Sequence, residues 1–353
     1  MKILILKPSS LGDVIHALPV LRLLKSRLPQ SEIYWWVDNR LKCLLVEDRD
    51  LTGIIPFDRE RWGSPFRWGE MFSSLQLLRS KRFDCAIDLQ GLARSGIFAW
   101  LSNSALTIGL DNGREGSREG ARAFYDLTPP PATPGTHAVD RYLAVLPLLH
   151  LPPHGTFEWL PKRPEIASQI QQKWNPAPGP WIVLLPGARW DNKRWPVGHF
   201  VELASLMRGM DALNFVILGG AGERAAGETI ARENPGRCLN LAGQTTLWEM
   251  IEWMRRARLV ICGDTGPMHA AAALGTPVIA LFGPTNPLKT GPYGKPGSVL
   301  HIHTLPCVPC MRSSCHYAVP RACLINLTPS DVYARVRQEL DAPPAPANGL
   351  WTL

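Results

Sequence analysis

Short, continuously apolar segments that end in glycine- or proline-containing loops recur along this chain, and they restrict its fold more than any other feature. In the second half these segments cover residues 181–185, 214–218, 259–262 and 277–282. The loops after them begin with Pro186-Gly187, Gly219-Gly220, Gly263-Asp264 and Gly283-Pro284. Runs of this length are typical of strands buried on both faces of a parallel sheet. The pattern predicts an α/β domain with its ligand at the carboxyl ends of the strands.

The first half follows the same order of elements. Residues 2–7 predict a buried strand, a glycine-containing loop follows, and apolar residues with helical spacing continue to Leu28. Further strands are predicted at 33–37 and 83–89. Because 353 residues are too many for one ordinary core, we expect two parallel α/β domains that face each other across a ligand-binding cleft.

Proline density marks the boundary between these domains. Residues 128–135 and 152–180 are rich in proline, which is disfavoured in helix interiors and typical of surface loops, although one helical stretch is predicted near residues 165–174. We therefore predict a first domain over 1–160 and a second over 161–328. A helix at about 329–341 ends the fold, and the Pro/Ala-rich tail over 342–353 is predicted to be disordered.

Composition narrows the classes of function. Hydrophobic residues make up 45% of the chain and charged residues 19%, which describes a globular protein. No apolar run reaches the roughly 18 residues of a membrane helix, and the N-terminal apolar run is too short for a secretory signal, so we expect a cytoplasmic protein. The net charge of +8 is a modest excess that a solvated surface explains, and a phosphate-bearing ligand or an anionic membrane surface is the alternative. No basic block or binding motif favours nucleic acid.

Asp13 lies in the first strand-to-helix loop and has two interpretations. A carboxylate in the first turn of a helix stabilises the helix dipole, which is a structural role. A carboxylate at the carboxyl end of a strand also faces the ligand side of the sheet, where it can act as a general base. The loop itself leaves both interpretations open.

The segment from Gly263 to His269 is the most specific stretch of the sequence. A strand ends there, two glycines allow close approach of a ligand, and an alanine-rich helix follows. The free N–H groups at a helix start bind phosphates, so Thr265 and Gly266 are candidate donors to a diphosphate. His269 would lie in the first turn of that helix, as a structural residue or as part of the site.

Two further loops carry weaker signals. Lys193 lies in a basic turn after the 181–185 strand, where it is either an exposed surface residue or a cation that neutralises a leaving diphosphate. Glu223 follows the glycines of 219–222 and is a candidate partner for ribose hydroxyls.

Taken together, these loops resemble those of glycosyltransferase family 9, the ADP-heptose:lipopolysaccharide heptosyltransferases. The matching segments occur in the family's order, at residues 7–13, 88–95, 191–196, 264–269 and 283–285. The resemblance covers about residues 1 to 330, and residues 109–112 and 137–141 look closest to the heptosyltransferase I branch. It implies a GT-B fold with two Rossmann-like domains, a central cleft and a C-terminal helix that crosses back to the first domain.

The resemblance also implies roles for individual residues in inverting transfer of a heptose from ADP-heptose to the Kdo–lipid A inner core of lipopolysaccharide, at the inner membrane surface. Asp13 would be the base and Lys193 would contact the donor phosphates. The expected donor-binding residues are Gly187, Ala188, Lys193, Glu223, Asp264, Thr265, Gly266 and His269. The expected acceptor-binding residues are Ser10, Gly12, Gln90 and Arg94. Arg59, Arg61 and Arg67 lie in a basic segment that is a further candidate for acceptor contact. No family motif covers this segment, so these three arginines are not aligned with family positions.

One departure from the family pattern affects the donor site. The heptosyltransferase I branch has two threonines after the strand near residue 185, whereas this chain has Gly187-Ala188. Side-chain hydroxyl contacts to the donor phosphates are excluded at these two positions, and backbone N–H groups would have to replace them.

Four cysteines near the C-terminus form a separate pattern. Cys307, Cys310, Cys315 and Cys323 have the spacing C-x2-C-x4-C-x7-C, which in a cytosolic protein suits a tetrahedral zinc or iron site. The alternatives are a reduced, metal-free loop and an opportunistic disulfide. The transfer reaction itself is expected to require no cofactor, because Lys193 and the helix start at Gly266 supply positive charge to the leaving group.

Other functions remain open at this point. A family member with another acceptor, such as a protein O-heptosyltransferase, would carry the same donor motifs. A nucleotide-sugar-binding protein without catalysis is less consistent with the presence of both Asp13 and Lys193. A NAD-dependent oxidoreductase is disfavoured, because no G-x-G-x-x-G follows the first strand.

Overall fold

The structure is a computed structural model that describes residues 1–58, 68–110, 120–210, 213–342 and 350–353. The chain divides into two compact units. The first unit comprises Met1–Trp159 and Leu350–Leu353, and the second comprises Leu160–Gly349. Among the described residues, no helix is both long and apolar enough to cross a membrane.

The first unit contains a parallel sheet in the order β3-β2-β1-β4-β5. Its strands are β1 (Lys2–Leu6), β2 (Glu32–Asp38), β3 (Gly53–Phe57), β4 (Cys85–Asp88) and β5 (Leu106–Gly109). Strand β1 lies in the middle, with Ile5 opposite Trp35 and Ile87, and its apolar side chains are fully buried. The continuous apolar run at the N-terminus is thus explained by a central strand that is covered on both faces.

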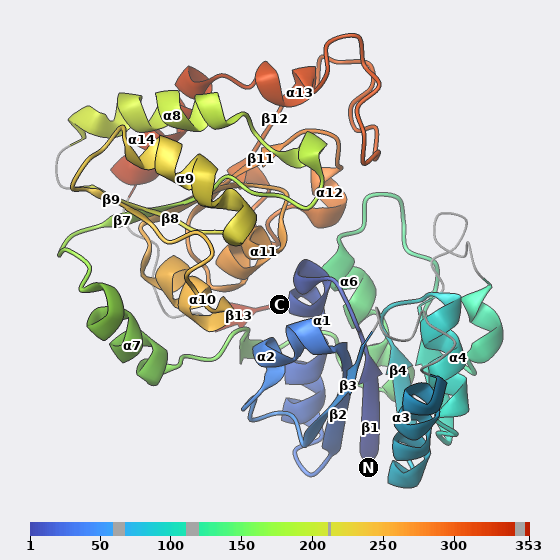
Figure 1. The fold of residues 1–353 in the computed structure, drawn as a ribbon. Coiled ribbons are helices and arrows are strands. Elements are labelled where there is room, and N and C mark those ends of the chain that lie inside the picture. Colours follow the sequence, from blue (N-terminus) through green and yellow to red (C-terminus); the bar gives the residue numbers. More distant parts are fainter. Residues whose placement is uncertain (59–67, 111–119, 211–212, 343–349) are drawn as a thin grey trace. The chain divides into compact units, whose positions relative to one another are not determined.

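The helices of the first unit follow its strands (Figure 1). They are α1 (Leu11–Arg27), α2 (Lys42–Leu45), α3 (Trp68–Lys81), α4 (Ala93–Leu101) and α6 (Ala138–Leu143), with 3-10 turns η1 (Asn39–Leu41), η4 (Ala121–Phe124) and η5 (Leu146–Leu149). Helix α1 packs against α6, and α4 packs against η4. These helices begin at the carboxyl ends of the strands, so the loops at residues 7–13 and 89–94 lie at one edge of the sheet.

The second unit contains a parallel sheet in the order β12-β11-β10-β7-β8-β9. Its strands are β7 (Trp181–Leu185), β8 (Asn214–Ile217), β9 (Cys238–Asn240), β10 (Leu259–Gly263), β11 (Val278–Phe282) and β12 (Val299–His301). The strands predicted in this half are confirmed. The short edge strands β9 and β12 were not predicted, because their side chains are only half-buried and form no continuous apolar run.

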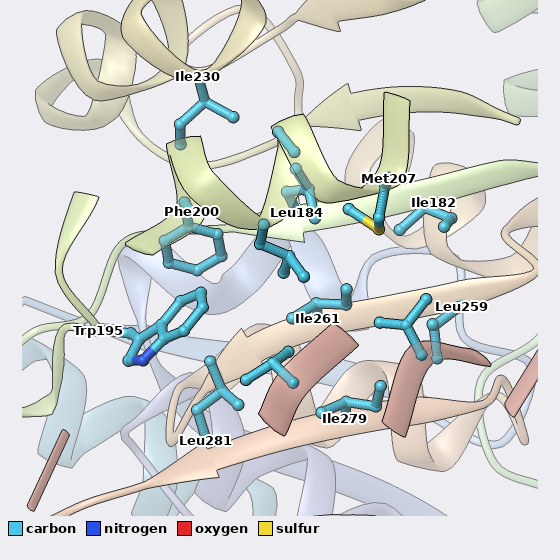
Figure 2. Close-up of a cluster of buried hydrophobic side chains, with 14 of the residues drawn as sticks. Ile182, Leu184, Trp195, Phe200, Met207, Ile230, Leu259, Ile261, Ile279 and Leu281 are labelled. Carbon is cyan, nitrogen blue, oxygen red and sulfur yellow. The ribbon is translucent and has the colours of Figure 1, made fainter. Parts of the chain in front are cut away.

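The helices of the second unit cover both faces of this sheet. They are α7 (Pro164–Trp174), α8 (Val197–Leu206), α9 (Arg224–Ala231), α10 (Leu247–Arg256), α11 (Gly266–Ala273), α12 (Pro287–Thr290), α13 (Ala322–Ile325) and α14 (Pro329–Asp341), with η6 (Asp191–Lys193), η7 (Met207–Gly209), η8 (Ala221–Glu223) and η9 (Pro296–Ser298). Alternate strand residues, such as Ile182 with Leu184 and Ile279 with Leu281, pack with Phe200 of α8 in one core (Figure 2). Helices α10 and α11 pack against each other and contact β7 and β10.

The C-terminal segment differs from the prediction in two ways. Helix α14 belongs to the second unit rather than the first, because Val332 and Val336 are buried in the second unit's core and the helix packs against α8 and β11. The tail is not wholly disordered, since β13 (Leu350–Thr352) pairs antiparallel with β6 (Thr156–Glu158). The segment that returns to the first unit is therefore this strand, which the Pro/Ala-rich composition of the tail did not indicate.

Candidate functional site

Asp13 lies in the first turn of α1 and is held by contacts to both of its carboxylate oxygens. Its Oδ2 accepts hydrogen bonds from the Ser10 backbone N–H at 2.8 Å and from the Ser10 hydroxyl at 2.7 Å. Its Oδ1 accepts a hydrogen bond from the Tyr142 hydroxyl at 3.2 Å. The side chain remains 40% exposed. The structural interpretation of Asp13 as a helix-start residue is confirmed, and the exposed carboxylate is also available to a ligand.

A buried lysine lies beside this carboxylate. The Nζ of Lys7 is 3.9 Å from Asp13 Oδ1, donates a hydrogen bond to Leu89 O at 3.1 Å, and lies 4.6 Å from the centre of the Tyr142 ring. Sequence reasoning missed both Lys7 and Tyr142. The available signal was a lysine directly after a buried strand, where charged residues are seldom buried without a partner.

The β4 loop carries the predicted acceptor residues and is organised by Asp88. The buried Asp88 carboxylate accepts hydrogen bonds from the backbone N–H groups of Gln90 and Gly91, at 2.8 and 3.3 Å, and from the Tyr125 hydroxyl at 2.6 Å. Burial raises the pKa of Asp88, and these hydrogen bonds oppose the rise. Arg94 is exposed in the first turn of α4.

Gln90 and Gly12 complete the predicted acceptor group. The Oε1 atom of Gln90 is buried and has no hydrogen-bond partner in the described part of the chain. Gly12 is buried in the first turn of α1, next to the exposed Ser10. Since Leu89 O accepts from Lys7 Nζ, the structure brings the start of the β4 loop to the Asp13 group. The predicted Arg59, Arg61 and Arg67 lie outside the described residues.

In the second unit, Lys193 and Asp264 form a close ion pair. Lys193 Nζ lies 2.7 Å from Asp264 Oδ2, and the two side chains are 18% and 6% exposed. The ammonium also lies 4.4 Å from the centre of the Trp190 ring. A Cβ atom at Gly263 would come within 2.8 Å of Lys193 O, so glycine at this position allows the two loops to approach. Two segments that are 71 residues apart thus form one group.

The start of α11 has features of an anion-binding site. Thr265 is the N-cap residue with extended backbone, and its side chain makes no capping hydrogen bond. Its Oγ1 is buried without a partner among the described residues, as is the Oγ1 of Thr285 in the loop that follows the neighbouring strand β11. Unpaired buried hydroxyls are costly in the folded state and indicate a ligand-binding position. Thr285 was not predicted individually, although it ends one of the quoted motifs. His269 is buried in the same helix.

Glu223 and Gly187 lie together near these loops. A Cβ atom at Gly187 would approach Glu223 Cγ to 2.6 Å. Glu223 Oε2 accepts a hydrogen bond from Gly220 N at 2.9 Å, and its Oε1 is 3.6 Å from Arg194 Nη2. Arg194 also donates from Nε to Ala188 O at 2.9 Å. A larger side chain at position 187 would therefore have to displace the flexible Glu223 side chain.

The four C-terminal cysteines line one cavity, together with Asn192 and Arg321 among others. Backbone N–H groups of Arg321 and Tyr317 lower the pKa of the Cys315 thiol, whereas burial raises the pKa of Cys323 to about 11. Within the described ranges, no set of three or more His, Cys, Asp or Glu side chains is arranged so that it could hold a metal ion. The four thiols line this cavity together, and the metal site and the reduced, metal-free loop both stay predictions.

Comparison with known proteins identifies the family. The model of glycosyltransferase family 9 (heptosyltransferase) matches residues 71–319. The chain belongs to glycosyltransferase family 9. This chain is 35% identical to lipopolysaccharide heptosyltransferase 1 of Pseudomonas aeruginosa over an alignment of 337 residues. The alignment covers 90% of this chain and 88% of that protein.

Solved structures confirm the fold of the family 9 enzyme. The E. coli ADP-heptose lipopolysaccharide heptosyltransferase II is similar with a TM-score of 0.76 and 25% identity, over 96% of this chain and 98% of the other. The E. coli heptosyltransferase WaaC with ADP is similar with a TM-score of 0.74 and 25% identity, over 96% of this chain and all of the other. The predicted GT-B class, with two parallel α/β units, is confirmed, and the chain is a glycosyltransferase.

Proposed function

We propose that this enzyme transfers a heptose from ADP-heptose to the Kdo–lipid A inner core of lipopolysaccharide, with inversion at the anomeric carbon. The observation that carries the proposal is the partly exposed Asp13 carboxylate, held at the carboxyl end of the central strand of its sheet. Support comes from the names of its relatives, which include heptosyltransferase 1 of P. aeruginosa and a WaaC structure with ADP-2-deoxy-2-fluoro heptose.

Asp13 acts as the general base in this proposal. It accepts the proton of an acceptor hydroxyl while the electron pair of that oxygen attacks the anomeric carbon. The bond to the ADP oxygen breaks on the opposite face, so the configuration inverts, and the transition state has oxocarbenium-ion character. The hydrogen bonds from Ser10 and Tyr142 hold the carboxylate in place.

Lys193 and the start of α11 stabilise the departing diphosphate. Lys193 is already oriented by Asp264, so little reorganisation is needed when negative charge develops on the leaving oxygen. The Thr265 hydroxyl and the N–H of Gly266 lie where phosphate oxygens bind at helix starts. We assign His269, the backbone N–H groups of Gly187 and Ala188, and Glu223 to the remaining donor contacts, with Glu223 nearest the ribose.

Ser10, Gly12, Gln90 and Arg94 form the acceptor side in this proposal. Arg94 offers an exposed guanidinium to the carboxylates or phosphates of an inner-core acceptor. Gln90 has an amide oxygen without a partner among the described residues, and this oxygen can accept a hydrogen bond from a sugar hydroxyl.

The test of this function is the Asp13→Asn variant, assayed by ADP release from ADP-heptose with a Kdo–lipid A acceptor. The asparagine side chain retains an oxygen that can accept the Ser10 hydrogen bonds, so folding should be preserved while proton abstraction is lost. A loss of roughly 10²–10⁴-fold in kcat is expected for removal of a general base. Transfer at the wild-type rate by Asp13→Asn would refute the mechanism. If the wild-type enzyme transferred heptose only to an acceptor of another class, the acceptor assignment would be refuted.

We also propose that the exposed face of α4 contacts the anionic membrane surface that presents the lipid acceptor. Arg94, Ile97 and Trp100 are spaced three residues apart, and the apolar pair is 38% and 60% exposed. The exposed Arg122 lies on η4, which packs against α4, and Phe124 on the same turn has its ring 6.5 Å from that of Trp100. A tryptophan flanked by arginines suits the headgroup region of an anionic bilayer.

Sedimentation with lipid vesicles tests this contact. Trp100→Ser should reduce binding to vesicles that contain an anionic lipid, whereas Val197→Ser, an exposed apolar residue of α8 in the second unit, should not. Equal binding of Trp100→Ser and the wild-type enzyme would show that this face does not meet the membrane.

A further inference from the structure

Lys7 is placed so that its ammonium group has to be buried. Its backbone N–H donates to Trp36 O at 3.3 Å, and its carbonyl oxygen accepts from Trp35 Nε1 at 3.1 Å. These contacts to β2 fix the residue at the end of the central strand, and its side chain is 3% exposed. An ammonium group in such a position loses its hydration, which is unfavourable unless nearby groups compensate.

The compensating groups lead to Asp13. The Nζ of Lys7 has Leu89 O at 3.1 Å, the Tyr142 ring at 4.6 Å and Asp13 Oδ1 at 3.9 Å. Burial lowers the pKa of Lys7, while the negative charges of Asp13 and Asp88 raise it and Arg141 lowers it further. A methionine of similar length would fill this space without the loss of hydration. The charge is therefore unnecessary for packing, and its closest anionic partner is the proposed base.

Tyr142 contacts the same carboxylate oxygen from another element. Its hydroxyl donates to Asp13 Oδ1 at 3.2 Å from α6, which packs against α1 (Figure 1). Burial and the nearby Asp13 raise the pKa of Tyr142 well above its usual value, so this hydroxyl remains a proton donor throughout any practical assay range. The two oxygens of Asp13 are thus held separately, Oδ2 by Ser10 and Oδ1 by Tyr142 with Lys7.

We propose that Lys7 and Tyr142 are positioning residues that fix the Asp13 carboxylate and keep it ionised when an acceptor covers it. The inference rests on the proposed function of Asp13. An acceptor sugar over this exposed carboxylate would displace water, and the loss of water favours the protonated acid. A buried ammonium group nearby opposes that change, because positive charge favours the ionised form. The base then remains able to accept a proton at the moment of transfer.

Lys7→Met and Tyr142→Phe test the proposal through the pH dependence of kcat, measured with both ADP-heptose and the Kdo–lipid A acceptor at saturation, because kcat reports the ionisation of groups in the acceptor-bound enzyme. Each variant removes a group that favours ionised Asp13, so the acidic limb of the profile should move to higher pH, further for Lys7→Met. A tenfold lower kcat at a fixed pH on that limb corresponds to a displacement of about one pH unit. Besides Asp13, Asp88 and Arg141 act electrostatically on Lys7, and Arg141 also acts on Tyr142. His16 lies on α1 with its ring against that of His137. All four residues are retained in both variants.

Asp48→Asn is the control for a purely structural effect, because it should destabilise the same unit without removing a group that contacts Asp13. Asp48 is a buried partner of Arg22 in the same unit, with both of its oxygens 2.6 Å from the guanidinium. This variant should lower the melting temperature and leave the acidic limb in place. If Lys7→Met and Tyr142→Phe lose activity only in proportion to their loss of stability, with an unmoved limb, the proposal is overturned. If Asp13→Asn is fully active, the proposed function fails first; if it is inactive while Lys7→Met has a wild-type profile, only this inference fails.

Discussion

Tyr125→Phe should destabilise the first unit through one buried hydrogen bond. The Tyr125 hydroxyl donates to Asp88 Oδ2 at 2.6 Å, and Asp88 is fully buried. A hydrogen bond to a charged group contributes about 1.5–3 kcal/mol. Because Asp88 keeps its bonds from the N–H groups of Gln90 and Gly91, we expect a loss of about 2 kcal/mol in the free energy of unfolding. At roughly 2–4 °C per kcal/mol for a unit of this size, the melting temperature should fall by about 4–8 °C.

The effect should depend on pH with a defined sign. Burial raises the pKa of folded Asp88 above that of the unfolded chain, so the folded state holds its proton more tightly and this group's contribution to stability falls as pH rises. The Tyr125 hydrogen bond opposes that rise in pKa. Without this hydrogen bond the pKa of folded Asp88 should rise further. The difference in the free energy of unfolding between Tyr125→Phe and the wild-type enzyme should therefore increase as pH rises from about 4, where an unfolded aspartate titrates, to neutral pH.

Circular dichroism melts of Tyr125→Phe, Tyr34→Phe and Asp88→Asn provide the measurement. Tyr34 is a matched control in the same core cluster, because its hydroxyl reaches the exposed Glu32 carboxylate at 3.4 Å and its loss should cost less than about 0.5 kcal/mol. The double variant Tyr125→Phe/Asp88→Asn should show a coupling energy of about 1 kcal/mol or more. Equal melting temperatures for Tyr125→Phe and Tyr34→Phe would refute the reasoning.

The remaining predictions concern the second unit. Lys193→Ala should lower kcat/KM for ADP-heptose by roughly 10²–10³-fold, because it removes a preorganised cation from the leaving group; unchanged donor kinetics would remove the assigned role. Lys295 donates from Nζ to Gly275 O and Thr276 O, at 2.6 and 2.9 Å, and burial lowers its pKa to about 8. The unfolded chain, with the usual value of 10.5, then binds more protons between these pH values, so stability should rise from pH 8 to 10.5. Lys295→Met should flatten that rise in chemical denaturation, and a wild-type slope would contradict it. The four thiols share a cavity without metal-binding geometry among the described residues. Plasma mass spectrometry should therefore find less than one zinc or iron per chain, and Cys310→Ser should fold normally. A stoichiometric metal that is lost in Cys310→Ser would establish a metal site.

Much of the fold could be predicted because the pattern of adjacent residues specifies its central strands and the loops that follow them. The central strands β1, β7, β10 and β11 are continuous apolar runs, and burial on both faces of a parallel sheet requires that pattern. The loops at their carboxyl ends could be located for the same reason, and with them Asp13, Lys193 and Asp264. Edge strands such as β9 could not, because a half-covered strand needs few apolar residues.

The ends of the chain show what local sequence leaves undetermined. The apolar stripe of α14 predicts a helix, but not which core receives Val332 and Val336, because any sheet face can accept such a stripe. The pairing of β13 with β6 depends on backbone hydrogen bonds between segments far apart in the sequence, and these bonds carry little information about side-chain identity.

Asp13 shows the same division within the proposed site. The sequence by itself determined that a carboxylate follows the first strand and begins a helix, because strand, glycine loop and helix are contiguous. Only the tertiary structure decided that Lys7 is buried beside this carboxylate and that Tyr142, 129 residues away, donates to it. The physical reason is that the electrostatics of a buried group depend on which elements pack around it, and packing brings together residues that have no relation in sequence.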